Sequence, residues 1–218
     1  MGNLNLILFV CLAIPMSMMI WIFRGHSRSV CAFLLVGMFM CVFSGEINGL
    51  LLQQGGLDTQ DIAVNMAPMV EELAKALPIL FIAFLLKPTG QKLAEFSLAV
   101  GVGFATLENV SVLINAGAVS FSYAILRALG AGMMHGICTL IIGIAMAGVI
   151  GHKIVFVSGT LSTLSAAVIY HSIYNMLITS RYMVVGAVLP IVTFAVIVVA
   201  GTVQRRKSAK RLRESAGE

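Results

Sequence analysis

Six charged side chains and two histidines interrupt the apolar stretches of this 218-residue chain. They are Glu46, Glu71, Glu72, Lys75, Glu108, Arg127, His135 and His171. Ionisable groups are costly inside segments that cross a membrane, and they usually mark a functional site. Carboxylates can take a proton from water, and carboxylates and imidazoles are both zinc ligands. The chain therefore carries the residue types of a hydrolytic, metal-binding or ion-carrying centre.

The composition indicates that a lipid bilayer surrounds these residues. Hydrophobic residues make up 59% of the chain and charged residues 11%, and the mean hydropathy is +1.00. In a soluble domain roughly a quarter of the residues are charged, so this chain has too few charges to cover a water-facing surface. Because lipid leaves the backbone of an open sheet edge unsatisfied, the spanning elements must be helices. We predict an all-α, polytopic membrane helix bundle.

Seven segments are long enough to cross a bilayer, since a spanning helix needs about 20 apolar residues. They run roughly over Asn3–Phe23, Ser29–Leu52, Ile62–Leu86, Leu93–Ala116, Phe121–Ile150, Ile154–Ile178 and Met183–Val203. The fifth segment is the longest, and we expect it either to tilt or to break at Gly130 and Gly132. Together the segments form one predicted transmembrane domain over residues 1–204, followed by a basic tail over 205–218.

The distribution of lysine and arginine predicts the orientation, because short cytoplasmic loops are enriched in both. One predicted side holds the basic tail and most of the basic loop residues, whereas the opposite side holds only Arg181. The basic loop residues are Arg24, Arg28, Lys87, Lys92 and Lys153. We expect the N-terminus outside and the C-terminus in the cytoplasm. The tail lies near anionic lipid, and no nucleic-acid partner is expected because no soluble module accompanies it.

The predicted helices place most of the ionisable residues at one depth. At about 1.5 Å rise per residue, they lie roughly 22–26 Å from the cytoplasmic ends of antiparallel helices. The residues at this depth are Glu46, Glu71 with Glu72, Glu108, His135 and His171. They would meet in one slab, which lies toward the external side of the membrane.

Spacing along the helices predicts contacts within this slab. Residues four apart share a helix face, so we expect Glu71 to pair with Lys75, with Glu72 pointing about 100° away. Arg127 is expected to neutralise one of the carboxylates, and Glu46 to act as a counter-ion. A bound divalent cation, or protons on two glutamates, would balance the excess of negative charge.

Glutamates and histidines gathered in this way suit a zinc centre. A catalytic zinc needs three protein ligands and an open position for water, and a separate carboxylate then serves as the general base. His171 and Asn175 are four residues apart and can face one cavity. Asn175 could therefore donate a hydrogen bond to a developing oxyanion.

Four short motifs at these positions resemble those of the PrsW family of intramembrane proteases. EELAK at 71–75 resembles the family's EExxK motif, and FATLEN at 104–109 resembles its FxxxE element. The helix from Arg127 to His135, with a following Thr and Gly, is similar to the family's Arg-to-His helix, and HSIYN resembles HxxxN. The four motifs occur in order on four consecutive predicted helices, within about residues 65–180.

The wider superfamily of CAAX-prenyl and Abi-type membrane proteases has similar motifs, but this chain departs from them at two positions. Glu108 stands where they have His, and Lys75 lies one residue earlier than their Arg. Both departures favour the PrsW branch. PrsW-like proteins are classed as metalloproteases, whereas their prenyl-protease relatives use a water activated by glutamate and histidine without metal. The resemblance therefore leaves both a zinc-assisted and a metal-free mechanism open.

The resemblance implies a prokaryotic, multi-pass cell-membrane endopeptidase that hydrolyses a membrane-anchored protein, such as an anti-sigma factor, near the external side of the bilayer. In this interpretation Glu71 is the general base, Glu72 supports it, and Asn175 steadies the oxyanion. The residues expected to hold zinc are Glu108, His135 and His171.

Two other functions use the same residues differently. A proton- or cation-coupled transporter could relay ions over the buried carboxylates, although no inverted repeat is evident between the halves. A non-catalytic scaffold or immunity-type protein could keep the fold alone. Other intramembrane proteases fit less well, because the chain lacks HExxH and GxSG motifs, and Asp58 and Asp61 lie in a predicted loop.

Overall fold

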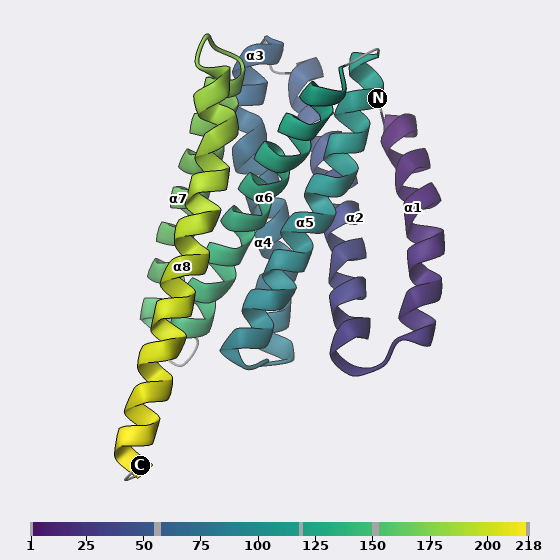
Figure 1. The fold of residues 1–218 in the computed structure, drawn as a ribbon. Coiled ribbons are helices and arrows are strands. Elements are labelled where there is room, and N and C mark those ends of the chain that lie inside the picture. The colour runs from purple at the N-terminus through teal and green to yellow at the C-terminus, as the bar shows by residue number, and fades with distance from the viewer. Residues whose placement is uncertain (1, 55–57, 118–119, 150–152, 217–218) are drawn as a thin grey trace.

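The computed structural model describes residues 2–54, 58–117, 120–149 and 153–216, and every regular element within these ranges is a helix. Figure 1 shows the long helices running side by side as one bundle. The predicted all-α class is thereby confirmed. The last two residues of the predicted tail, 217–218, lie outside the described residues.

Most helices begin and end close to the predicted segment boundaries, but the last one continues past Val203 through the predicted basic tail to Ala216. The helices are α1 (Gly2–Ile22), α2 (Gly25–Gln54), α3 (Thr59–Asp61), the π-helix η1 (Ile62–Met66), α4 (Ala67–Leu85), α5 (Gly90–Ala116), α6 (Phe121–Val149), α7 (Lys153–Ile178) and α8 (Met183–Ala216). Six described helices are long and apolar enough to cross a membrane, namely α1, α2, α5, α6, α7 and α8. The seventh predicted span corresponds to α4, which has 19 residues and contains Glu71, Glu72 and Lys75.

The longest predicted segment forms one continuous helix. α6 runs from Phe121 to Val149 through both Gly130 and Gly132. Of the two expectations for this segment, the break is therefore wrong. Intrahelical hydrogen bonds keep a glycine in line when neighbouring helices support it, which they do in a packed bundle.

Large apolar side chains on the outside of the bundle fit a lipid environment. Trp21 is 86% exposed, Phe121 82% and Ile22 75%. A water-soluble protein rarely exposes a contiguous apolar surface of this kind. The interior is also apolar away from the ionisable cluster, with Ile79, Leu93 and other aliphatic residues fully buried.

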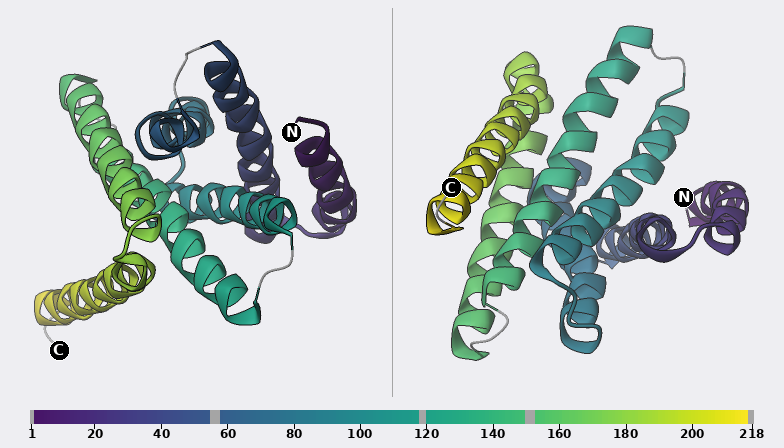
Figure 2. Two further views of the ribbon diagram at one scale, coloured as in Figure 1. Left: turned by 90° about the horizontal axis from the view of Figure 1, so that it is seen from above. Right: turned by 60° about the horizontal axis from the view of Figure 1, so that its bottom comes forward.

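The order of the helices across the bundle brings the residues at the common predicted depth together. Figures 1 and 2 show α1 and α8 at opposite edges, with α5 and α6 between them. Helix α5 packs against α2 on one side and α6 on the other, and α7 packs against α4, α6 and α8. Helices α4, α5, α6 and α7 can therefore all direct side chains into the same interior region.

Two glycines allow α5 to lie this close to its neighbours. A Cβ at Gly101 would come within 2.6 Å of the His135 carbonyl oxygen on α6, and one at Gly103 would overlap the Leu34 carbonyl on α2. Real Cβ atoms do not approach backbone oxygen so closely, so larger residues would push the helices apart. Gly101 therefore sets the distance between α5 and the turn of α6 that carries His135.

A short irregular segment leads into α4. Asp58 caps α3 by accepting a hydrogen bond from the Asp61 amide over 2.7 Å. The π-helix η1 follows directly, and α4 then begins with Pro68 in its first turn, where a missing N–H is tolerated. Wide π-helical turns occur often at functional sites, and this one immediately precedes the helix that carries Glu71 and Glu72.

Candidate active site

A line of polar contacts crosses the bundle from α4 to α6 and α5. The Lys75 ammonium donates to Glu72 Oε1 over 2.6 Å and lies 2.8 Å from His135 Nδ1. The other ring nitrogen of His135, Nε2, lies 2.5 Å from Glu108 Oε2. Arg127 then donates from a terminal nitrogen to Glu108 Oε1 over 3.0 Å. Three helices thereby share one continuous network of charged and polar side chains.

A second branch joins α4 to α7. His171 Nδ1 lies 2.8 Å from the same Glu72 oxygen that Lys75 contacts, and His171 Nε2 lies 3.8 Å from Glu71 Oε2. The rings of His135 and His171 stand edge to face with centroids 4.9 Å apart. The two histidines and Glu71 therefore surround one small interior region.

The cluster lies deep within the protein. Glu72 and Lys75 have no exposed side-chain surface, and His135 and His171 are 1% and 2% exposed. The three carboxylates of the cluster face only two permanently charged bases, Lys75 and Arg127, which leaves an excess of one negative charge if all ionise. A buried unpaired charge is strongly unfavourable. The site is therefore built to take up one further positive charge, either a proton or a metal ion.

The partners of the two histidines determine which ring nitrogens carry hydrogen. An ammonium has only donors, so His135 Nδ1 accepts from Lys75 and Nε2 donates to Glu108. An ionised carboxylate has only acceptors, so His171 Nδ1 donates to Glu72. His171 Nε2 is then left facing Glu71 Oε2 over 3.8 Å, so these two atoms can share a proton or a cation.

The structure brings five of the six predicted site residues into this cluster. They are Glu71, Glu72, Glu108, His135 and His171. The sixth, Asn175, lies on the same helix as His171 but donates to the Ala63 carbonyl of η1 over 2.9 Å. Its side chain thus connects α7 to the π-helix that precedes α4.

Three predicted contacts have different outcomes. The expected pairing of Arg127 with a carboxylate is confirmed by its contact with Glu108. The expected Glu71–Lys75 pair is wrong, because Lys75 bonds to Glu72, three residues earlier, and residues three apart also share a helix face. Glu46 is exposed on α2, and no ion pair among the described residues joins it to the cluster.

Sequence reasoning assigned no role to two residues that enclose the cluster. The Lys75 ammonium lies 4.6 Å from the centre of the Phe104 ring, which also packs against His135 with ring centroids 5.0 Å apart. The Thr139 hydroxyl donates to the His135 carbonyl over 2.6 Å. Phe104 stands four residues before Glu108, so helical spacing could have placed it on the site-facing side of α5.

Glu71, His135 and His171 have the chemistry of a metal-binding group. One ligand atom from each lies within 4.8 Å of the others. Glu71 Oε2 is buried without a hydrogen-bond partner, which is the state of an atom whose partner is a metal ion or a water molecule. Zinc accepts imidazole nitrogen and carboxylate oxygen together. The residues present therefore fit a metal, provided that His135 Nε2 releases its hydrogen, as metal ligands do on binding.

The fold and the cluster together define a multi-pass membrane protein with a buried histidine–carboxylate site. The comparison with protein families gives the particular family. The model of the PrsW family intramembrane metalloproteases matches residues 25–201, most of the chain, so the chain belongs to this family. The matched range includes α4 to α7 and all five predicted site residues that lie in the cluster. Neither the curated proteins nor the solved structures contain a match.

Proposed function

We propose that the protein hydrolyses a peptide bond of a membrane-anchored protein within the bilayer, near its external side, with zinc assistance. One observation carries the proposal: Glu71 Oε2 is buried without a partner, 3.8 Å from His171 Nε2 and in one group with His135. A carboxylate with free lone pairs among histidines is suited to remove a proton from water.

Glu71 is the proposed general base. Glu108 is a poorer proton acceptor, because it already shares its charge with the Arg127 guanidinium and bonds to His135. Glu72 is also a poorer proton acceptor, because its Oε1 holds both the Lys75 ammonium and His171, although its Oε2 has no hydrogen-bond partner. Glu72 therefore supports the reaction by orienting His171 rather than by taking the proton itself.

Glu108, His135 and His171 are the proposed zinc ligands. Glu108 takes the place of Glu71 in this set because its Oε2 lies 2.5 Å from His135 Nε2, which leaves Glu71 of the geometric group free to act as the base. Zinc, when bound, supplies a Lewis acid that polarises the scissile carbonyl and favours the ionisation of water. Lys75 holds the His135 ring and Glu72 holds the His171 ring, in each case through the Nδ1 atom of the histidine. Residues that hydrogen-bond to metal-ligating histidines commonly orient the rings in this way. Arg127 holds the Glu108 carboxylate in place in the same way.

Asn175 is the proposed oxyanion donor. One amide hydrogen is engaged by the Ala63 carbonyl, and the amide has a second hydrogen to offer. Removing a donor of this kind commonly costs about 10²–10³-fold in kcat. Asn175 would then have two tasks, which are to hold η1 and to stabilise the tetrahedral intermediate.

The substrate and the setting follow from the family and the charge distribution. We propose a single-span membrane protein as the substrate, of which an anti-sigma factor is one example, and a prokaryotic cell membrane as the location. The single domain over residues 1–204 would lie in lipid, with the N-terminus outside and the basic tail over 205–218 in the cytoplasm. The site would then open toward the external half of the bilayer.

Comparison of membrane proteomes tests the proteolysis. Cells that express the wild-type protein should contain new peptide termini from single-span proteins, whereas cells with Glu71→Gln should lack them. Glu95→Gln is the matched control, because Glu95 lies on α5 outside the cluster, bonded to Gln91 and His26. New termini that persist undiminished in Glu71→Gln would refute the role of Glu71.

Metal analysis of the purified variants separates the ligands from the base. Loss of a ligand should reduce both the zinc content and cleavage, so Glu108→Gln and His171→Gln should lose both. Glu71→Gln should retain stoichiometric zinc and lose cleavage by about 10²–10⁴-fold, the usual contribution of a general base. If Glu71→Gln loses zinc while Glu108→Gln keeps it, the two glutamates exchange roles. An active wild-type enzyme without stoichiometric metal would establish the metal-free mechanism instead.

A further inference from the structure

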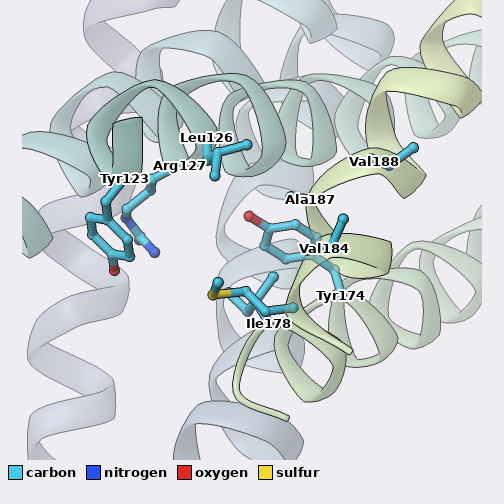
Figure 3. Close-up of a pocket in the computed structure, with 9 residues that line it drawn as sticks. Tyr123, Leu126, Arg127, Tyr174, Ile178, Val184, Ala187 and Val188 are labelled. Atoms are coloured by element: carbon cyan, nitrogen blue, oxygen red, sulfur yellow. The ribbon is translucent and has the colours of Figure 1, made fainter. Parts of the chain in front are cut away.

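A small pocket adjoins the cluster where α6, α7 and α8 meet. Its volume is about 160 Å³, and its walls are mostly aliphatic and aromatic. Figure 3 shows Tyr123 and Arg127 at one end and Tyr174, Ile178 and Val184 at the other. The pocket is lined by the first turns of α8 and of α6 and by the last turns of α7, so it lies at the same end of the bundle as the cluster.

Arg127 is common to the pocket and the cluster. It lines the pocket and also donates to Glu108, whose second oxygen contacts His135. A second connection runs through α7, because Tyr174 lines the pocket one turn after His171. A group held in the pocket would therefore lie beside the residues proposed to carry out the hydrolysis.

The Arg127 guanidinium in the pocket wall has unused hydrogen-bond donors. A guanidinium carries five N–H donors, and the side chain is 12% exposed and bonds through one terminal nitrogen to Glu108. Leaving such a group unpaired costs free energy, so a ligand with an acceptor would gain by filling the pocket. A lipid acyl chain has no acceptor. A peptide unwound from its helix for cleavage has free carbonyls, which need donors inside a membrane.

The size of the pocket limits what can enter it. An apolar protein cavity of about 150 Å³ takes up a benzene molecule, and a helix with its side chains is about 10–12 Å wide. The pocket thus accommodates a single side chain of leucine or phenylalanine size rather than a whole helix. The apolar walls of Ile178 and Val184 match such a side chain.

We propose that this pocket selects the substrate: it binds a leucine- or phenylalanine-sized side chain next to the scissile bond, while the Arg127 guanidinium donates to a neighbouring peptide carbonyl. The inference rests on the proposed proteolysis and adds a specificity determinant to it. Val184 is the position to test, because it lines the pocket and is 70% exposed on α8, so a larger side chain fits there without disturbing the core.

The test uses a set of single-span reporter proteins that share one external juxtamembrane segment. Each reporter carries a single guest residue, Ala, Leu, Phe or Trp, at one position of that segment, and the set covers every position in turn. The wild-type enzyme should cleave the Leu and Phe reporters at least about tenfold faster than the Ala reporter at one position relative to the cut. Val184→Phe fills the pocket and should reverse that preference. Val185→Phe is the matched control, because Val185 is 54% exposed and does not line the pocket.

A binding measurement complements the cleavage rates. A photoreactive benzophenone amino acid at position 184, in a Glu71→Gln background, should crosslink the Leu and Phe reporters but not the Ala reporter. The same group at position 185 should crosslink lipid alone. The pocket's role would be overturned if both positions crosslinked lipid alone. It would also be overturned if positions 184 and 185 crosslinked the reporters with equal yield.

The outcomes separate the pocket from the proteolysis. If wild type and Val184→Phe both cleave the reporters with the same guest-residue preference, the pocket does not select the substrate. The proposed proteolysis would stand in that case. Guest-dependent crosslinking at position 184 without cleavage of any reporter by the wild-type enzyme would support the pocket as a peptide-binding site and refute the proteolysis.

Discussion

Lys75 is the residue on which the ionic network depends. Its ammonium is fully buried, it contacts both Glu72 and His135, and it faces the ring of Phe104. Lys75→Met keeps the length of the side chain but leaves the Glu72 charge without its cation. Breaking a buried ion pair by removing one partner costs about 3–5 kcal/mol. We therefore expect a lower midpoint of thermal unfolding for Lys75→Met in detergent micelles.

The double variant Lys75→Met/Glu72→Gln serves as the control for this interpretation. Removing both charges also removes the uncompensated carboxylate, and the glutamine oxygen can still accept from His171. The double variant should recover most of the stability lost in the single variant. A double variant as unstable as Lys75→Met would show that packing of the lysine stem, rather than charge, holds this part of the bundle.

The sequence predicted which residue types meet at the site but not which atoms pair. A common depth on neighbouring helices predicted that Glu72, Glu108, His135 and His171 meet, but Glu46 at the same predicted depth on α2 is exposed outside the cluster. The sequence does not decide whether Glu71 or Glu72 pairs with Lys75, because spacings of three and four residues both bring side chains together on a helix. Lys75 pairs with Glu72, the glutamate whose Oε1 also contacts His171 of α7.

Among the helices, close approach of α5 to α6 is what brings Glu108 to His135. Gly101→Ala should disturb it, because the added methyl group would come within 2.6 Å of the His135 carbonyl oxygen. Overpacking of this kind typically costs about 1–3 kcal/mol. At roughly 2–4 °C per kcal/mol for a chain of this size, the midpoint of thermal unfolding should fall by several degrees.

Gly132→Ala on α6 is the matched comparison. No atom lies within 4 Å of a Cβ at that position, so the new methyl group meets nothing. Alanine is favoured over glycine inside a helix by about 0.5–1 kcal/mol, so this variant should be as stable as the wild type or slightly more stable. Equal losses in the two variants would mean that contact with His135 does not determine the effect of Gly101→Ala.

Apolar length and turn residues located most helix ends, and α5 ends at Ala116 and α6 begins at Phe121 as predicted. They did not predict that α8 continues to Ala216, because the basic tail is not an apolar segment. The π-helix over Ile62–Met66 was not predicted, because its five residues are too few for the wider turn to show in the apolar periodicity. Its carbonyl contact with Asn175 depends on a helix more than a hundred residues later in the chain, with the hydrogen bond spanning 112 positions.

For the whole molecule, the orientation in the membrane decides from which side a substrate reaches the site. Figure 1 shows α1 beginning at one end of the bundle and α8 ending at the other. The basic residues of the loops and tail favour the cytoplasm for the end of α8. Single cysteines at Thr59 on α3 and Ser208 on α8, which are both exposed, report on the two sides.

A membrane-impermeant maleimide should label Thr59→Cys in intact cells and Ser208→Cys only after the membrane is permeabilised. The parent protein serves as the blank, because three of its cysteines are buried, and Cys11 is exposed within the apolar helix α1, out of reach of a polar reagent in lipid. The reverse labelling pattern would place the site in the cytoplasmic half of the bilayer. Substrates would then have to present their cleavable segment from the cytoplasm, and externally exposed anti-sigma factor segments would no longer qualify.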